Sequence, residues 1–133
     1  MKLSNREIKF KFYCDESCTM SRIFTLEELA NGRYDFHCDI NKAIKLQYTG
    51  LKDKNGVEIY EGDIVKDSSS RFMSIVWDDR FGTSRFVLKA INSVHHIKAG
   101  RILNTHDWIL QDDNDIEVVG NIYENPELLK GEV

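Results

Sequence analysis

Hydrophobic residues alternate with polar ones along several short stretches of this chain, and a period of two predicts β-strands with one buried face. Near the start, Ile8, Phe10 and Phe12 alternate with charged residues and predict a strand over residues 6–13. The other stretches that we expect to be strands are residues 34–40, 44–48, 57–60, 64–65, 72–77, 84–90, 108–110 and 116–123. Such a succession of short strands is typical of an all-β barrel or sandwich.

Turn signals separate these strands. Residues 54–57 read Lys-Asn-Gly-Val, which favours a tight turn because Asn and Gly tolerate positive φ angles. The segment 49–53 before it is too polar for a long strand, so we expect the turn to close a loop and not a regular hairpin. Residues 72–77 and 84–90 predict the clearest β-hairpin.

Helical signals are few. Thr25 and Glu28 have the spacing of a capping box, and the apolar residues that follow end at Gly32, which predicts one or two helical turns. Pro126 stands at the start of residues 126–130 and predicts a short terminal helical turn.

The chain has 133 residues, of which 41% are hydrophobic and 30% charged, enough for one buried core. We expect a single compact, mainly β domain over residues 1–133, and residues 62–90 would suit a small SH3-like barrel. No apolar run approaches the roughly 20 residues that span a bilayer. No secretory signal is apparent near Met1, so we expect a cytoplasmic protein.

The formal net charge of −4 is unevenly distributed. Residues 1–100 carry 16 Lys and Arg against 14 Asp and Glu, whereas residues 101–133 carry 2 against 8. This balance argues against a general polyanion binder, since such proteins need a dense basic surface. A local basic face on the first 100 residues leaves a nucleic-acid-binding module open as an alternative. It would use Lys9, Lys11, Arg71, Arg80, Arg85 and Lys89.

Cys14, Cys18, His37 and Cys38 supply enough sulfur and nitrogen donors for a zinc site. The repeated Cys-x2-Cys spacing of such sites is missing, and neighbours on a strand point to opposite faces. We therefore expect reduced cysteines packed as small apolar residues and no bound metal.

Candidate bases for an enzyme are Asp63, His95, His96 and His106. The chain has no Gly-x-Ser-x-Gly motif and no glycine-rich phosphate loop, so a hydrolase is the less favoured hypothesis. The acidic pairs at 78–79 and 112–115 are typical of solvated turns, and Asp63 of an Asx turn before a strand. We assign no catalytic, cofactor-binding or metal-binding residue and expect no cofactor.

Two segments are more specific: residues 47–56, which run on into 59–65, and residues 119–129. Together with a short start at residues 6–10, they resemble the signature of the YopX family of phage and prophage proteins. The family has no assigned activity, so the resemblance implies a context and a fold without a reaction. Residues 68–115 match no pattern of the family, and any function located there does not carry over.

The resemblance favours a phage accessory protein. Because no convergent catalytic constellation is apparent, we expect a non-catalytic domain that binds a phage or host macromolecule of unknown identity. Edge strands could also pair between copies to form a homo-oligomer. Tyr48, Tyr60 and Tyr123 lie in the family-like segments, where they could stack on bases, but half-buried strand positions are the favoured interpretation. We expect these segments to hold the fold through glycines at bends, namely Gly50, Gly56, Gly62 and Gly120.

Overall fold

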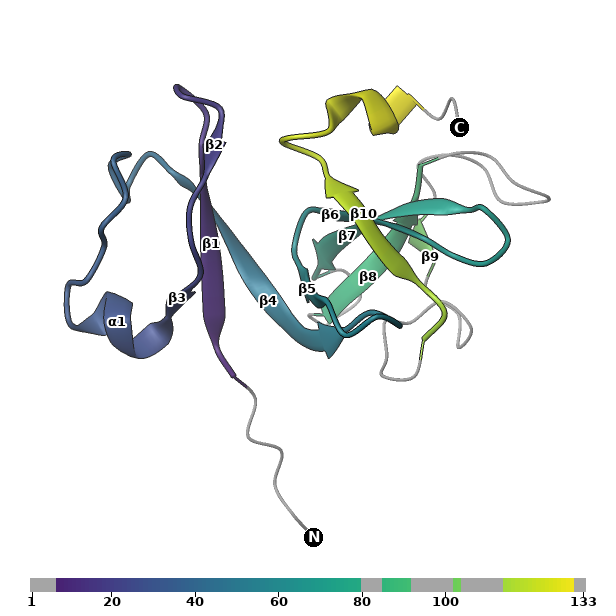
Figure 1. The fold of residues 1–133 in the computed structure, drawn as a ribbon, viewed down its shortest axis with the longest axis horizontal. Coiled ribbons are helices and arrows are strands. Elements are labelled where there is room, and N and C mark those ends of the chain that lie inside the picture. Colours follow the sequence, from purple (N-terminus) through teal and green to yellow (C-terminus); the bar gives the residue numbers. More distant parts are fainter. Residues whose placement is uncertain (1–6, 80–84, 92–101, 104–113, 131–133) are drawn as a thin grey trace, which may run out of the picture.

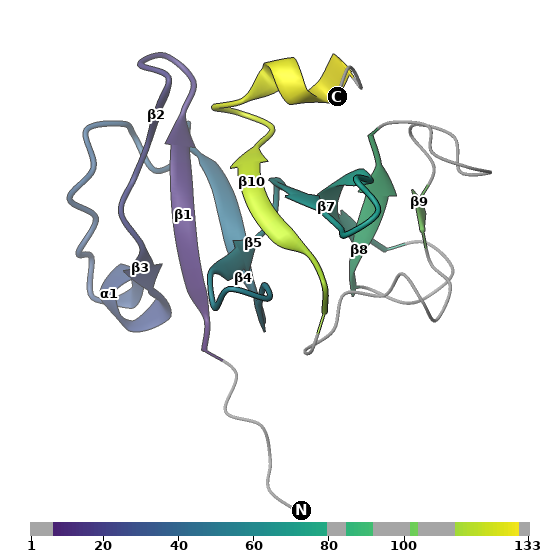
Figure 2. The ribbon, with the colours of Figure 1, turned by 45° about the vertical axis from the view of Figure 1, so that its right-hand side comes forward.

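Two antiparallel β-sheets are the main structural elements of the computed structural model, which describes residues 7–79, 85–91, 102–103 and 114–130 (Figures 1 and 2). The first sheet has the order β2-β1-β4-β5, with β3 also paired to β1, and the second has the order β10-β6-β7-β8-β9. The strands of the first sheet are β1 (Lys9–Cys14), β2 (Thr19–Met20), β3 (Phe24–Thr25), β4 (Ile44–Lys52) and β5 (Glu58–Tyr60). Those of the second are β6 (Asp63–Lys66), β7 (Phe72–Asp78), β8 (Arg85–Ala90), β9 (Ile102–Leu103) and β10 (Glu117–Asn121). The prediction of a mainly β fold is confirmed.

The first sheet is covered on one face by helix α1 (Leu26–Ala30), as Figure 1 shows. Phe10 and Phe12 alternate along β1 as predicted and pack with Phe24 of β3 in one core cluster. The predicted capping box is present: the Thr25 hydroxyl accepts from the Glu28 N–H at 3.1 Å, and the Glu28 carboxylate accepts from the Thr25 N–H at 3.1 Å. The helix therefore begins where the sequence predicts.

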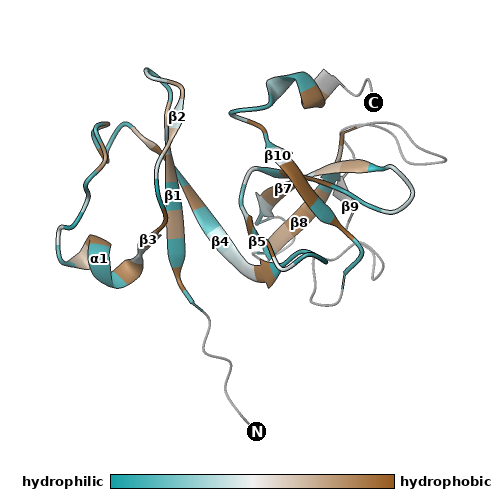
Figure 3. Ribbon diagram, in the orientation of Figure 1, coloured by the Kyte–Doolittle hydropathy of each residue, from teal (hydrophilic) through white to brown (hydrophobic). Residues whose placement is uncertain are grey.

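The second sheet contains the larger aliphatic cluster, and apolar residues mark β7, β8 and β10 in Figure 3. Strands β7 and β8 pair from Met73 opposite Ala90 to Asp78 opposite Arg85, which confirms the predicted hairpin. The buried members of the cluster are Ile59, Val65, Met73, Ile75, Leu88, Ala90 and Ile116. After β10, Pro126–Lys130 form the 3-10 helix η2, so the predicted terminal turn is also confirmed.

Gly62 joins the two sheets at the turn between β5 and β6. Its N–H donates to the Ile75 carbonyl at 2.8 Å, its carbonyl accepts from Ile122 N–H at 2.9 Å, and its φ is +86°. Close by, the Tyr13 ring of β1 stacks on the Tyr123 ring after β10, with centroids 5.0 Å apart. The family-like segment 119–129 therefore meets the first sheet at this junction.

Two of the strand predictions were wrong. Residues 34–40 form no strand, although their burial alternates, because β1 already pairs with β2 and β3 on one side and with β4 on the other. Strand β4, in contrast, continues through the polar segment 49–52, where the register with β5 shifts and Gly50 has a φ of +90°. The Thr49 hydroxyl donates to the Ile59 carbonyl at 2.8 Å, which explains how this polar residue is buried in the strand.

The turn after β4 also differs from the prediction. Lys52 pairs with Glu58, so residues 53–57 close a true hairpin between β4 and β5. Only Gly56 has a positive φ there, at +82°. The predicted strand at 108–110 lies outside the described residues, and within them no helix is long and apolar enough to cross a membrane.

Candidate functional site

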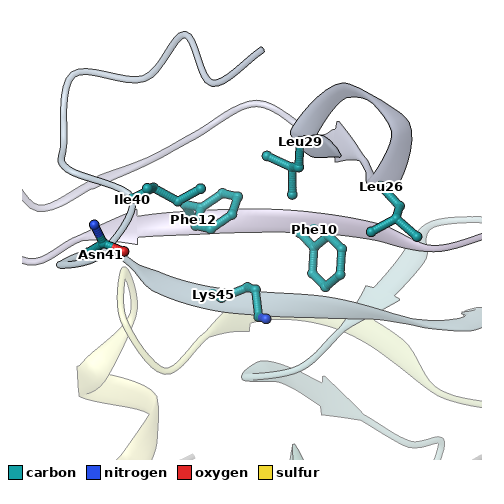
Figure 4. Close-up of a pocket in the computed structure, with 7 residues that line it drawn as sticks. All are labelled: Phe10, Phe12, Leu26, Leu29, Ile40, Asn41 and Lys45. Carbon is teal, nitrogen blue, oxygen red and sulfur yellow. The ribbon is translucent and has the colours of Figure 1, made fainter. Parts of the chain in front are cut away.

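A groove of about 430 Å³ lies between helix α1, the loop before β4, and the outer face of β1 and β4 (Figure 4). Figure 4 shows the two leucines of α1 above the phenylalanine rings of β1. The residues that line the groove are Phe10, Phe12, Leu26, Leu29, Ile40, Asn41 and Lys45.

Local sequence explains how each wall forms. Leu26 and Leu29 are three residues apart, so the capped turn projects both toward the sheet. On the other wall, Asp39 organises a turn: its carboxylate accepts from Asn41 N–H at 3.0 Å, and its carbonyl accepts from Lys42 N–H at 2.9 Å. This turn presents Ile40 at the rim.

The groove combines an apolar floor with one positive charge. Phe10 and Phe12 are 7% and 2% exposed, whereas Leu26 and Ile40 at the rim remain 49% and 42% exposed. The Lys45 Nζ lies 5.3 Å from the centroid of the Phe10 ring, and among the described residues no carboxylate lies within ion-pair distance of it. A ligand with an apolar group beside an anionic group would match this arrangement.

No residue of the groove was predicted from the sequence to have a function, and Phe10 and Phe12 were expected on the buried face of a strand. The signal that could have indicated the groove is the short predicted helix in residues 25–32, which carries two leucines. A helix of one or two turns cannot bury both leucine side chains completely.

The family-like tyrosines lie between the sheets and not on an open face. Tyr60 and Tyr48 are 1% and 5% exposed, and Tyr123 stacks on Tyr13. Burial raises the pKa of Tyr60, whose hydroxyl donates to Glu58 at 3.1 Å. These rings are not available to stack on bases, so the structural interpretation is confirmed for Tyr48 and Tyr60.

Several of the basic residues considered for nucleic acid already have partners. Lys9 forms ion pairs with Glu7 and Glu58, and the Lys11 Nζ lies 4.3 Å from the centroid of the Tyr60 ring. Arg71 Nε donates to Asp67 Oδ2 at 2.5 Å. Arg85 is half-buried, Lys89 is exposed, and Arg80 lies outside the described residues. Less free positive charge is therefore available to a polyanion than the sequence suggested.

Asp63 is buried and serves the backbone. Its Oδ2 accepts from Tyr60 N–H at 2.8 Å, across the turn that Gly62 occupies. Burial raises the pKa of Asp63 to about 6, although the Tyr60 N–H and the charge of Lys11 act in the opposite direction. In an Asx turn the carboxylate accepts from the N–H two residues later, whereas Asp63 accepts from Tyr60, three residues earlier, so the predicted Asx turn was wrong. His95, His96 and His106 lie outside the described residues.

The variant Asp63→Asn tests the raised pKa. Because the folded-state value of about 6 exceeds the ordinary 3.8, the folded chain binds more protons between these values, and the wild type loses stability as the pH rises through that window. Asparagine does not ionise, and its amide oxygen can still accept the Tyr60 N–H. From about pH 4 to about pH 7, the variant should therefore gain up to about 3 kcal/mol relative to the wild type. Urea unfolding across this range measures the difference, with the exposed Asp79→Asn as control, and parallel pH profiles for wild type and Asp63→Asn would contradict the assignment.

The four residues considered for zinc do not all come together, although Cys14 and Cys38 lie side by side. His37 Nε2 lies 2.7 Å from the Ser17 hydroxyl and 3.2 Å from the Thr19 hydroxyl, while the exposed Cys18 thiol donates to the Asp15 carbonyl at 3.7 Å. Within the described part of the chain, no group of three or more His, Cys, Asp or Glu side chains is placed to hold a metal.

The acidic pairs predicted as solvated turns have different surroundings. Asp78 is 6% exposed and pairs with Arg85 at the end of β7, so the prediction was wrong for this residue. Asp115 is exposed and accepts from the Ser68 hydroxyl at 2.8 Å, and residues 112–113 lie outside the described residues.

Comparisons with known proteins define the class. The model of the YopX protein family matches residues 3–130, so the chain belongs to that family. Among solved structures, it is similar to the crystal structure of protein EF1440 from Enterococcus faecalis. The two are 24% identical, the match covers 92% of this chain and 97% of that chain, and the TM-score is 0.49. No curated protein matched the chain.

Proposed function

We propose that this chain is a phage- or prophage-encoded, non-catalytic binding domain that acts in the cytoplasm of the bacterial host. The observation that carries the proposal is the groove, where Leu26 and Ile40 stay 49% and 42% exposed above the floor of Phe10 and Phe12. Apolar side chains around a concavity are typical of a binding site. Residues 1–133 act as one domain, a view supported by the family match over residues 3–130.

The occupant that the groove fits best is a segment of a partner protein with a large apolar side chain next to a carboxylate. The apolar side chain would contact the phenylalanine floor under α1. The carboxylate would approach the Lys45 ammonium, which has no ion-pair partner among the described residues. The apolar contact would supply most of the affinity, and the charge would orient the ligand.

Selection of peptides from a random displayed library against the whole chain tests this function. The selected peptides should share an apolar residue beside Asp or Glu. A synthetic peptide of that sequence should bind the double variant Leu26→Ser, Ile40→Ser at least about tenfold more weakly, since each buried aliphatic side chain contributes on the order of 1.5 to 3 kcal/mol. Lys45→Glu should also weaken peptide binding, and the loss of affinity should be larger at low salt than at high salt.

The control is Val57→Ser, because Val57 is 49% exposed and apolar but lies in the turn before β5, outside the groove. This variant should bind the peptide like the wild type. If the peptide binds the double groove variant as tightly as the wild type, the groove is not the binding site. If selection yields only basic or wholly polar peptides, the ligand class is wrong.

A further inference from the structure

Cys14 and Cys38 lie together although 24 positions separate them in the sequence. Cys14 ends β1 and is 2% exposed, and Cys38 lies in the segment before β4 and is 8% exposed. The neighbouring His37 ring is held on the β1–β2 hairpin by the Ser17 and Thr19 hydroxyls. The thiol of Cys38 lies within hydrogen-bond reach of the Cys14 sulfur, and neither cysteine is in a disulfide.

The two sulfurs have different surroundings. The Cys38 thiol, the Ser17 hydroxyl and the backbone N–H groups of Ser17 and Glu16 donate to Cys14 and lower its pKa, against the opposing effect of burial. The hydrogen bond to Cys14 and burial raise the pKa of Cys38 to about 11. Of the two sulfurs, Cys14 therefore has the lower pKa.

The third cysteine is arranged differently. Cys18 is exposed, with a φ of +54°, and its thiol points to the Asp15 carbonyl within its own turn. It is thus a separate surface thiol, which a single substitution can remove without disturbing the buried pair.

We propose that Cys14 and Cys38 form a reversible oxidation site, at which a peroxide converts the two thiols into an intramolecular disulfide. The Cys14 thiolate attacks one oxygen of hydrogen peroxide, the O–O bond breaks, and hydroxide leaves, so that Cys14 becomes a sulfenic acid. The Cys38 sulfur then attacks the Cys14 sulfur; the S–S bond forms, the S–O bond breaks, and the Cys38 proton leaves with the hydroxide as water. Overall, two thiols lose two electrons and two protons, and one peroxide is reduced to two molecules of water.

The bond would close the segment that carries α1 onto the end of β1. Cys38 stands two residues before Ile40 at the rim of the groove, so oxidation would fix that wall in place. Formation of the disulfide does not depend on what the groove binds.

The test uses the full chain with Cys18→Ser, which leaves only the buried pair. Folded protein treated with hydrogen peroxide should lose two hydrogen atoms in mass, lose both alkylatable thiols, and yield a peptide that links Cys14 to Cys38. Dithiothreitol should reverse all three changes. Two further variants each keep a single thiol and serve as controls. When Cys38→Ser is added, only Cys14 remains, and it should accumulate a sulfenic acid that dimedone traps. When Cys14→Ser is added instead, only Cys38 remains, and it should react with peroxide much more slowly.

Circular dichroism of each variant before treatment establishes that it is folded. Oxidation of Cys14 to a sulfinic acid with Cys38 still free would overturn the proposal. A disulfide between two chains, or a Cys14–Cys18 link in the oxidised wild type, would overturn it equally.

Discussion

The substitution Asp53→Ala is expected to lower the free energy of unfolding by at least about 3 kcal/mol relative to the wild type. The Asp53 carboxylate accepts from Asn55 N–H at 2.8 Å and Val57 N–H at 2.9 Å with one oxygen, and from Val118 N–H at 2.9 Å with the other. The residue is 6% exposed. Alanine would leave all three donors without this acceptor, and a hydrogen bond to a charged group contributes about 1.5 to 3 kcal/mol.

Equilibrium unfolding in urea at neutral pH measures this effect. Asp79→Ala is the matched control, since Asp79 is exposed at the end of β7 and should change stability by no more than about 0.5 kcal/mol. A loss in Asp53→Ala as small as in this control would show that the three hydrogen bonds are dispensable.

The stabilisation by Asp53 should also depend on pH. Burial alone would raise the pKa of Asp53, but the Val118, Val57 and Asn55 N–H groups and the charge of Lys54 outweigh it, so the pKa lies below the ordinary 3.8. Stabilisation by this group is therefore complete above the ordinary value and disappears as the pH falls through the folded-state value. The stability difference between wild type and Asp53→Ala should shrink in acid.

Local signals in the sequence predicted the elements whose partners are close in the chain. The capping box of Thr25 and Glu28 is closed by atoms three residues apart, and the β7–β8 hairpin pairs two strands that are neighbours in the sequence. Both follow from short-range geometry, which a sequence shows directly.

Alternation was a weaker guide where pairing depends on distant strands. Tyr34, Phe36 and Cys38 alternate with exposed residues because they cover the first sheet, yet their backbone has no strand beside it. Alternation of apolar and polar residues thus indicates that one side of a segment is buried, and it does not show that the backbone is hydrogen-bonded to a neighbouring strand. The opposite error occurred at Thr49, whose polarity concealed a strand position satisfied by the Ile59 carbonyl.

The groove could not be predicted because its walls come from three separate parts of the chain. Leu29 of α1, Phe12 of β1 and Lys45 of β4 are adjacent only after the helix folds over the sheet. The oxidation pair has the same origin, since Cys14 of β1 and Cys38 before β4 are 24 residues apart and meet only in the folded chain.

The glycines of the family-like segments were predicted to hold bends, but for different physical reasons. Gly62 has a φ of +86°, which residues with a side chain rarely adopt, whereas Gly120 does not have a positive φ. A Cβ on Gly120 would lie 2.5 Å from Asn125 Oδ1, the atom that accepts the Asn121 N–H at 3.1 Å. Close approach of this side chain, and not backbone conformation, excludes a larger residue there.

Gly62→Val is expected to lower the free energy of unfolding by about 3 kcal/mol. Left-handed backbone at a non-glycine residue accounts for about 1 to 2 kcal/mol of this, and a β-branched side chain is strained further. A Cβ would also lie 3.1 Å from Tyr123 Cε2 and 3.6 Å from Leu46 Cδ2, so the Tyr13–Tyr123 stack that joins the sheets has to shift.

Gly32→Val separates these two contributions. Gly32 has a similar φ of +75°, but a Cβ there would have nothing within 4 Å. The loss of stability in this variant should therefore come from backbone strain alone. Urea unfolding of both variants should place Gly62→Val at least about 1 kcal/mol below Gly32→Val. Equal losses would mean that the junction between the sheets accommodates a side chain at Gly62, and that the family-like segments are not under the packing constraint inferred for them.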